Sequence, residues 1–218
     1  DVAVPVSWYV VDEGRNDMFY FKVGNQVLQE RVTPGNYSLV TLNEELVAKM
    51  ASAGFTDYFV SAPNVSKNII RIVGTTTTTF EILTDKQVRD LGYDSSATVN
   101  NILRNFTAKV NHNNSVYESG FVDLFPIRNL YLSCSGLGNF NTMSVSGERS
   151  IVKKIPVNAG YGEMIFDQSV VGIDYLDCSH QTLSRVGFQL KDVFGRVVDL
   201  HGNHFSFSIV FSRISEIQ

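Results

Sequence analysis

The last third of the chain contains the strongest strand pattern in the sequence. Along residues 205–211, large apolar side chains occupy every second position, and serine stands at most of the positions between them. Successive side chains of a strand point to opposite faces, so this segment predicts a strand with one packed face. We expect it in the middle of a sheet, with Phe207 and Ile209 facing the core. Residues 186–190 repeat the alternation, and Gly195 supplies a turn, so the two segments predict an antiparallel pair.

Short extended segments recur along the rest of the chain, with Gly, Asn and Pro between them. About ten such strands with little helix predict an all-β antiparallel sandwich or barrel. A parallel fold built from alternating strands and helices would need far more helix. The predicted strands cover residues 19–23, 26–32, 58–62, 69–73, 76–83, 121–125, 130–133, 150–157, 163–166 and 173–176, followed by the final pair.

Two segments predict short helices that lie in loops. In residues 39–50, apolar side chains follow helical spacing and Ser38 stands where a helix cap is needed. Before residues 85–91, Thr84 and Gln87 form a capping box. The expected glycine stops are Gly54 and Gly92.

Size and charge limit the possible functions. The 218 residues are 44% hydrophobic, enough for a substantial core, and we expect one main domain. The net charge is −4, only 18% of residues are charged, and no block of Lys and Arg occurs. Nucleic-acid binding through phosphates requires clustered cations, so we expect no nucleic-acid partner.

The sequence also argues against membrane insertion and a disulfide framework. The longest apolar runs, such as residues 8–11, are far too short to cross a bilayer. The first residues lack the charged-then-apolar pattern of a signal segment, so we expect none there. The two cysteines, Cys134 and Cys178, are too few to staple a chain of this length, so we expect both to be reduced.

The only close histidine pair is His201 and His204, and Asp199 adds a third possible metal ligand. A cupin-type site needs paired histidines on a strand and distant ligands that converge inside the barrel. No such partners are spaced correctly here. His and Asn are common in turns, so we interpret this segment as a turn without metal.

A second cluster offers no better metal site. Asp174 and Asp177 lie an odd number apart, so on a strand they face opposite ways. Cys178 and His180 would share a face, but two ligands do not complete a zinc site.

No catalytic nucleophile or phosphate-binding motif appears either, and we expect no enzyme activity, catalytic residue, metal or cofactor. Four glycosylation triplets, acceptors only in a secreted chain, begin at Asn36, Asn64, Asn105 and Asn113.

One pattern links the chain to a known family. Residues 192–202 spell Asp-x-x-Gly-Arg-x-Val-Asp-Leu-x-Gly and are followed by the Phe-Ser-Phe-Ser-Ile-Val-Phe strand. This resembles the minor capsid, or penton, proteins of virophages and related Polinton-like double-stranded DNA viruses. The resemblance covers most of the chain and also includes residues 33–39, 91–93, 128–133, 151–157 and 161–165.

The resemblance implies a single jelly-roll β-sandwich over residues 1–218, with about eight core strands and an extra loop or insertion around residues 84–120. It implies a homopentamer at the five-fold vertices of an icosahedral capsid, beside the capsomers of the major capsid protein. The expected location is the virion, assembled in the host cytoplasm.

Two other functions remain open from the residues alone. A receptor- or glycan-binding β-sandwich on a virion or cell surface would use aromatic loops and polar turns equally well. A cupin-like metalloenzyme is the third class, and it would contain metal in one-to-one ratio.

Overall fold

Antiparallel strands dominate the computed structural model, which describes residues 1–75, 79–94, 100–102, 111–113, 115–125, 127–137, 150–168, 176, 178 and 185–211. Within these residues, the strands form four small sheets of three or four strands each, and the helices are few. The predicted predominance of antiparallel β-structure is therefore confirmed.

The chain divides into two compact units. Unit 1 consists of Asp1–Trp8 and Ile127–Gln218, and unit 2 is Tyr9–Pro126. Each unit has its own apolar core. This division differs from the expected single domain over residues 1–218 with an insertion around residues 84–120. Unit 2 is much longer than the expected insertion. It begins directly after the first strand of the chain, because that strand pairs with strands from the C-terminal part and so belongs to unit 1.

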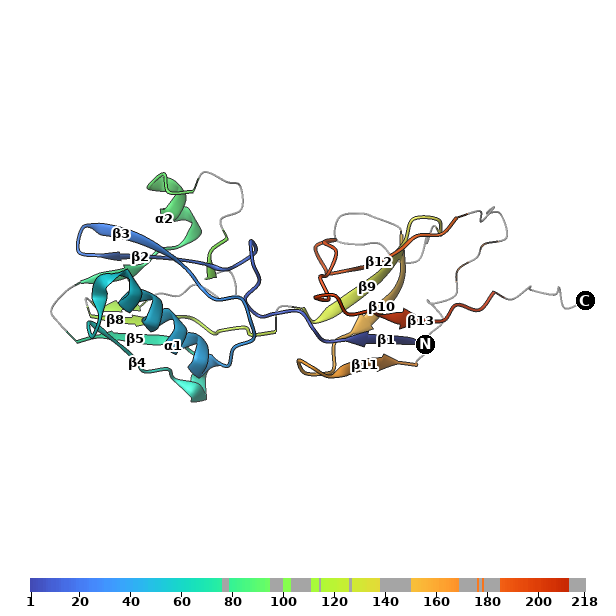
Figure 1. Cartoon of the computed structure of the whole chain (residues 1–218), viewed down its shortest axis with the longest axis horizontal. Coiled ribbons are helices and arrows are strands. Elements are labelled where there is room, and N and C mark those ends of the chain that lie inside the picture. Colours follow the sequence, from blue (N-terminus) through green and yellow to red (C-terminus); the bar gives the residue numbers. More distant parts are fainter. Residues whose placement is uncertain are drawn as a thin grey trace, which may run out of the picture. The chain divides into compact units, whose positions relative to one another are not determined.

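Unit 1 contains two three-stranded sheets. In the first, the N-terminal strand lies between two strands from the C-terminal part of the chain (Figure 1). Apolar side chains from both sheets form one cluster, so the sheets enclose a common core. The strand orders are β11 (Met164–Asp167), β1 (Val2–Pro5) and β13 (Ser206–Phe207) in one sheet, and β10 (Ile151–Pro156), β9 (Asn129–Cys134) and β12 (Phe188–Lys191) in the other.

Alternation along β1 decides which side chains enter this core. Val4 is fully buried, and its partner Ile165 on β11 is 1% exposed. From the other sheet, Leu130 and its partner Ile155 are also fully buried. Burying side chains of this size contributes roughly 1.5–3 kcal/mol each, so these residues are the main stabilising element of unit 1.

An ion pair joins the inward faces of the two sheets. Lys153 on β10 lies opposite buried Leu132, and Asp167 on β11 lies opposite buried Val2. The Lys153 Nζ is 3.5 Å from Asp167 Oδ2, with the side chains 13% and 11% exposed. Charges this far from water require a close opposite charge. The pair therefore fixes how β10 and β11 face each other.

The expected C-terminal strand is much shorter than its sequence pattern. β13 spans only Ser206–Phe207. The Phe207 ring packs against the unit 1 core, with its centroid 4.7 Å from that of Phe188 on the other sheet. The inward position predicted for Phe207 is confirmed, but the one predicted for Ile209 is wrong, since Ile209 is 38% exposed. Among the described strands β13 pairs only with β1, at the edge of its sheet, and residues 208–211 beyond it are exposed.

Unit 2 contains the other two sheets and the helices. Its elements are β2 (Met18–Val23), β3 (Gln26–Arg31), α1 (Leu39–Met50), the π-helix η1 (Ala51–Phe55), β4 (Phe59–Ser61), the 3₁₀ helix η2 (Val65–Lys67), β5 (Arg71–Gly74), β6 (Phe80–Ile82), α2 (Asp85–Asp90), β7 (Asn111–Asn113) and β8 (Val116–Glu118). The sheet orders are β3-β2-β6 and β4-β5-β8-β7.

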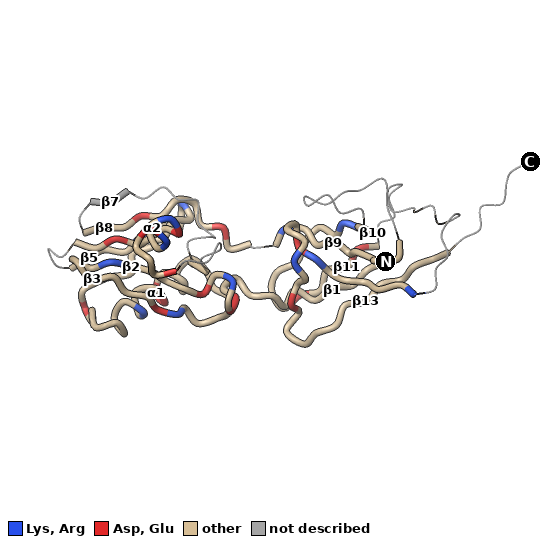
Figure 2. The backbone as a smooth tube through the Cα atoms, turned by 90° about the horizontal axis from the view of Figure 1, so that it is seen from above, with Lys and Arg blue, Asp and Glu red and all other residues tan. Residues whose placement is uncertain are grey.

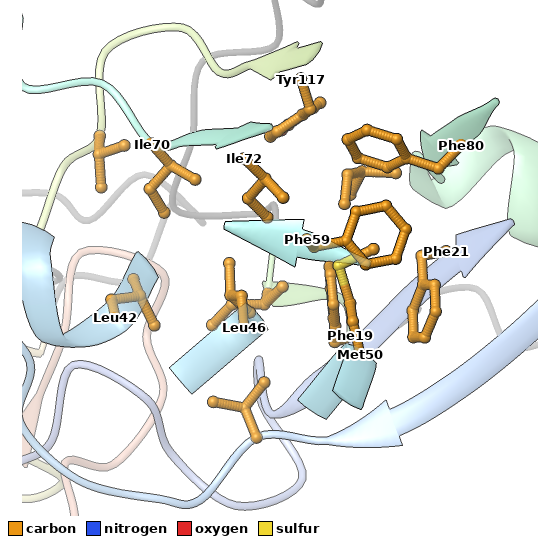
Figure 3. Packing of buried hydrophobic residues seen from close by; sticks show 14 of the residues in the cluster. Phe19, Phe21, Leu42, Leu46, Met50, Phe59, Ile70, Ile72, Phe80 and Tyr117 are labelled. Carbon is orange, nitrogen blue, oxygen red and sulfur yellow. The ribbon is translucent and has the colours of Figure 1, made fainter. Parts of the chain in front are cut away.

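Both predicted helices are present. Ser38 caps α1 by accepting from the Thr41 amide, and Thr84 with Gln87 forms the capping box of α2. Gly54 breaks the helical path after α1 with a φ of 103°. The apolar face of α1, including Leu42 and Leu46, enters the unit 2 core with side chains from both of that unit's sheets (Figure 3).

A buried amide fastens α1 to the four-stranded sheet. Asn43 is fully buried; its Nδ2 donates to the Arg71 carbonyl at 3.0 Å and to Ser61 Oγ. Its Oδ1 accepts from the Arg71 amide at 3.0 Å. A buried polar group is tolerated only when it is hydrogen-bonded, and these bonds fix the helix on β4 and β5.

We predict different costs for truncating the two residues of the C-terminal pattern. Phe207→Ala should lower the free energy of unfolding of unit 1 by about 2–3 kcal/mol, because a partly buried ring leaves the core. Ile209→Ala should change it by less than about 0.5 kcal/mol, because this side chain is exposed. Urea unfolding followed by the fluorescence of Trp8, the single tryptophan and 5% exposed in unit 1, measures both. Equal losses would show that residues 206–211 form one packed strand.

The ion pair predicts strong coupling. Lys153→Met should destabilise unit 1 by about 2–4 kcal/mol, because the mostly buried Asp167 carboxylate loses the cation that lies 3.5 Å from it. Adding Asp167→Leu should recover most of that loss, because two apolar side chains then replace the pair. The same Trp8 fluorescence reports the double variant and both single variants, Lys153→Met and Asp167→Leu. A double-variant loss equal to the sum of the two single losses would refute the coupling.

Candidate interaction surfaces

The histidine-containing loop holds a backbone turn in place. The His201 amide donates to Asp199 Oδ1 at 2.8 Å, and His201 Nδ1 lies 2.7 Å from the Ser7 carbonyl oxygen. Ser7 Oγ donates to the Leu200 carbonyl at 2.8 Å. His201 has a φ of 50°, the left-handed conformation found in turns. These contacts fasten the loop to the end of the segment that carries β1.

Of the other candidate Asp, Cys and His residues from the sequence, the structure describes only the two cysteines. Asp174, Asp177 and His180 lie outside the described residues, and Cys134 and Cys178 are free thiols. Among the residues that the structure describes, no group of three His, Cys, Asp or Glu side chains is placed to hold a metal ion. The same part of the chain includes no helix long and apolar enough to cross a membrane.

Two asparagines of the glycosylation triplets accept hydrogen bonds from backbone amides. Asn36 Oδ1 accepts from the Val10 amide at 3.1 Å, and Asn64 Oδ1 accepts from the Lys67 amide at 3.2 Å. The side chains of Asn105 and Asn113 lie outside the described residues. Asn36 and Asn64 therefore have local structural contacts independent of any glycan.

The outer side of the paired strands β11 and β1 is apolar, and its β11 residues are exposed. Met164 is 43% exposed and Phe166 is 65% exposed. Their cross-strand partners on the same face are Pro5 and Ala3 of β1. Residues opposite each other on antiparallel strands project to the same side, so these four side chains form one surface. We call it the β11 face.

A tight hairpin follows β12 in the same unit. Asp192 is 7% exposed, and its Oδ1 accepts from the amides of Phe194 at 2.8 Å and Arg196 at 3.0 Å. Its Oδ2 accepts from Arg196 Nε at 2.7 Å and lies 2.6 Å from Nη2. Gly195 has a φ of 80°, a conformation that favours glycine. One buried carboxylate thus fixes the whole turn.

This rigid turn presents apolar side chains to solvent. Phe194 is 67% exposed, Val197 62% and Val193 38%. The Arg196 guanidinium carbon lies 4.9 Å from the centre of the Phe194 ring, within cation–π range. We call this feature, residues 192–197, the Phe194 tip. An aromatic side chain held rigidly in water is typical of an anchor for a partner protein, since little entropy is lost on binding.

The sequence analysis identified neither the β11 face nor the Phe194 tip, although each has a recognisable pattern in the sequence. The three successive apolar residues 164–166 break the alternation expected of a strand with one wet face. Asp192 followed by Gly195 and Arg196 has the composition of a carboxylate-stabilised turn, and the residue between them is a phenylalanine.

Charge is mixed throughout the described chain. Figure 2 shows Lys and Arg interspersed with Asp and Glu along the backbone of each unit. Phosphate binding depends on cations gathered on one face. Apolar contacts are therefore the better basis for a partner than charge.

Comparison with known proteins gives no relative: no protein-family model, curated protein or solved structure matches the chain.

We predict that Asp192 is what makes the tip rigid. Asp192→Ala should speed hydrogen exchange at the Phe194 and Arg196 amides by roughly tenfold or more, because charge-assisted bonds to both are lost. Asp199→Ala is the matched control, since it releases the His201 amide instead. Unchanged exchange at Phe194 would mean that other contacts hold the turn.

Proposed function

We propose that the chain is a structural capsid subunit, a penton that forms a ring of five at the vertices of an icosahedral shell. The observation that carries this proposal is the presence of two different exposed apolar surfaces on unit 1, the β11 face and the Phe194 tip. A closed ring requires two unlike, complementary surfaces on each subunit, because its contacts run head to tail. A single self-complementary apolar surface would give two-fold dimers instead.

Unit 1 is the proposed jelly roll. Its two described antiparallel sheets share one core, as expected for part of such a sandwich. The sequence pattern that resembles penton proteins, residues 192–202, lies in this unit and contains the Phe194 tip. Unit 2 interrupts the jelly roll after β1.

The proposed partners are four further copies and the neighbouring capsomers of the major capsid protein, in a virion assembled in the host cytoplasm. The net charge of −4 and the interspersed positions of cationic and anionic residues along the backbone favour protein partners over genome. On this proposal the chain has no catalytic activity.

Native mass spectrometry of the purified chain tests the proposal. We expect a species of five copies that survives raised salt, because apolar contacts are not screened. A stable trimer or monomer with measurable sugar affinity would favour the receptor-binding alternative. Tight, salt-sensitive binding to duplex DNA would contradict the charge argument, and metal in one-to-one ratio would favour the metalloenzyme.

A further inference from the structure

The Phe194 tip and the β11 face of unit 1 differ in shape. The Phe194 tip is a narrow turn with one projecting ring, flanked by Val193 and Val197. The β11 face is a strand surface, on which Met164 and Phe166 stand two residues apart along the same side. A projecting ring can pack between two side chains spaced in this way.

Their chemistry is complementary as well. Methionine sulfur and aromatic rings both make favourable contacts with a phenylalanine ring. Beside Phe194 stands Arg196, whose guanidinium pairs with Asp192 while its side chain stays 50% exposed. Beside Met164 stands exposed Glu163, whose Oε2 accepts from the Gly160 amide at 2.6 Å. A half-exposed cation therefore borders one surface, and a solvent-facing carboxylate borders the other.

We infer that the Phe194 tip of one copy docks on the β11 face of the next copy, with Phe194 packed between Met164 and Phe166. This inference rests on the proposed ring of five and names the contact that would build it. A second copy of the chain is the occupant that fits, because every copy carries both surfaces. Both surfaces are apolar, and the charged residues that border them are opposite in sign. Because the surfaces are unlike, each subunit uses one of them toward each neighbour.

Two charge substitutions test the contact. Phe194→Asp removes the aromatic ring from the Phe194 tip, and Phe166→Asp places a charge on the β11 face. Each substitution alone should weaken ring formation at least tenfold. Phe125→Asp is the matched control, since Phe125 is 69% exposed in unit 2 and should leave the ring unchanged. Trp8 fluorescence during urea unfolding checks that every variant is folded, and Phe194→Ser and Phe166→Ser replace any variant that is not.

Mixing the two variants gives the decisive result. Each keeps one intact surface, so an equimolar mixture should form a heterodimer through a single wild-type contact and then stop. Native mass spectrometry of isotopically labelled Phe194→Asp with unlabelled Phe166→Asp detects that species. If the wild type forms rings and both folded variants do too, or if the mixture yields no heterodimer, the contact is overturned while the penton proposal stands. A wild-type chain without rings would instead overturn the proposed function.

Discussion

The pairing of β1 with β11 and β13 is the constraint on which unit 1 depends. This four-residue strand comes from the beginning of the chain, yet it is the central strand of its sheet. Its inward valines meet Ile165 on one side and Phe207 on the other. The sheet therefore forms only after residues from both ends of the chain meet, which makes its folding slow compared with the local helices of unit 2.

The same geometry produces the exposed apolar face. One side of the β11-β1-β13 sheet is occupied by the core, so alternation sends every second residue of β11 outward. Apolar residues at those outward positions add only cross-strand contacts with Ala3 and Pro5 to the stability of an isolated subunit. The Phe194 tip is built differently, since a buried carboxylate holds the turn and leaves the ring in solvent. Both features are compatible with the contacts between neighbouring copies that we propose.

Local signals could be predicted from the sequence, whereas long-range pairing could not. Ser38 and the Thr84–Gln87 box determine helix starts through contacts three residues away, and both predictions are confirmed. The division into two units depends on pairing between residues that are far apart in the sequence. The four residues of β1 are too few to show in the sequence which distant strands they pair with. Ile209 follows a strand alternation but lies beyond the end of β13 and is 38% exposed. Buried Asn43 gave no signal, because its partners lie on strands that the helix reaches only after folding.

An electron-microscopy map of the assembled oligomer tests the central claim most directly. We expect the map to show five copies around one axis, with the Phe194 ring of each copy lying against Met164 and Phe166 of its neighbour. Unit 1 should form the ring, and unit 2 should lie outside these contacts. A two-fold assembly in which identical surfaces meet, or a ring whose contacts leave both Phe194 and Phe166 in solvent, would contradict it.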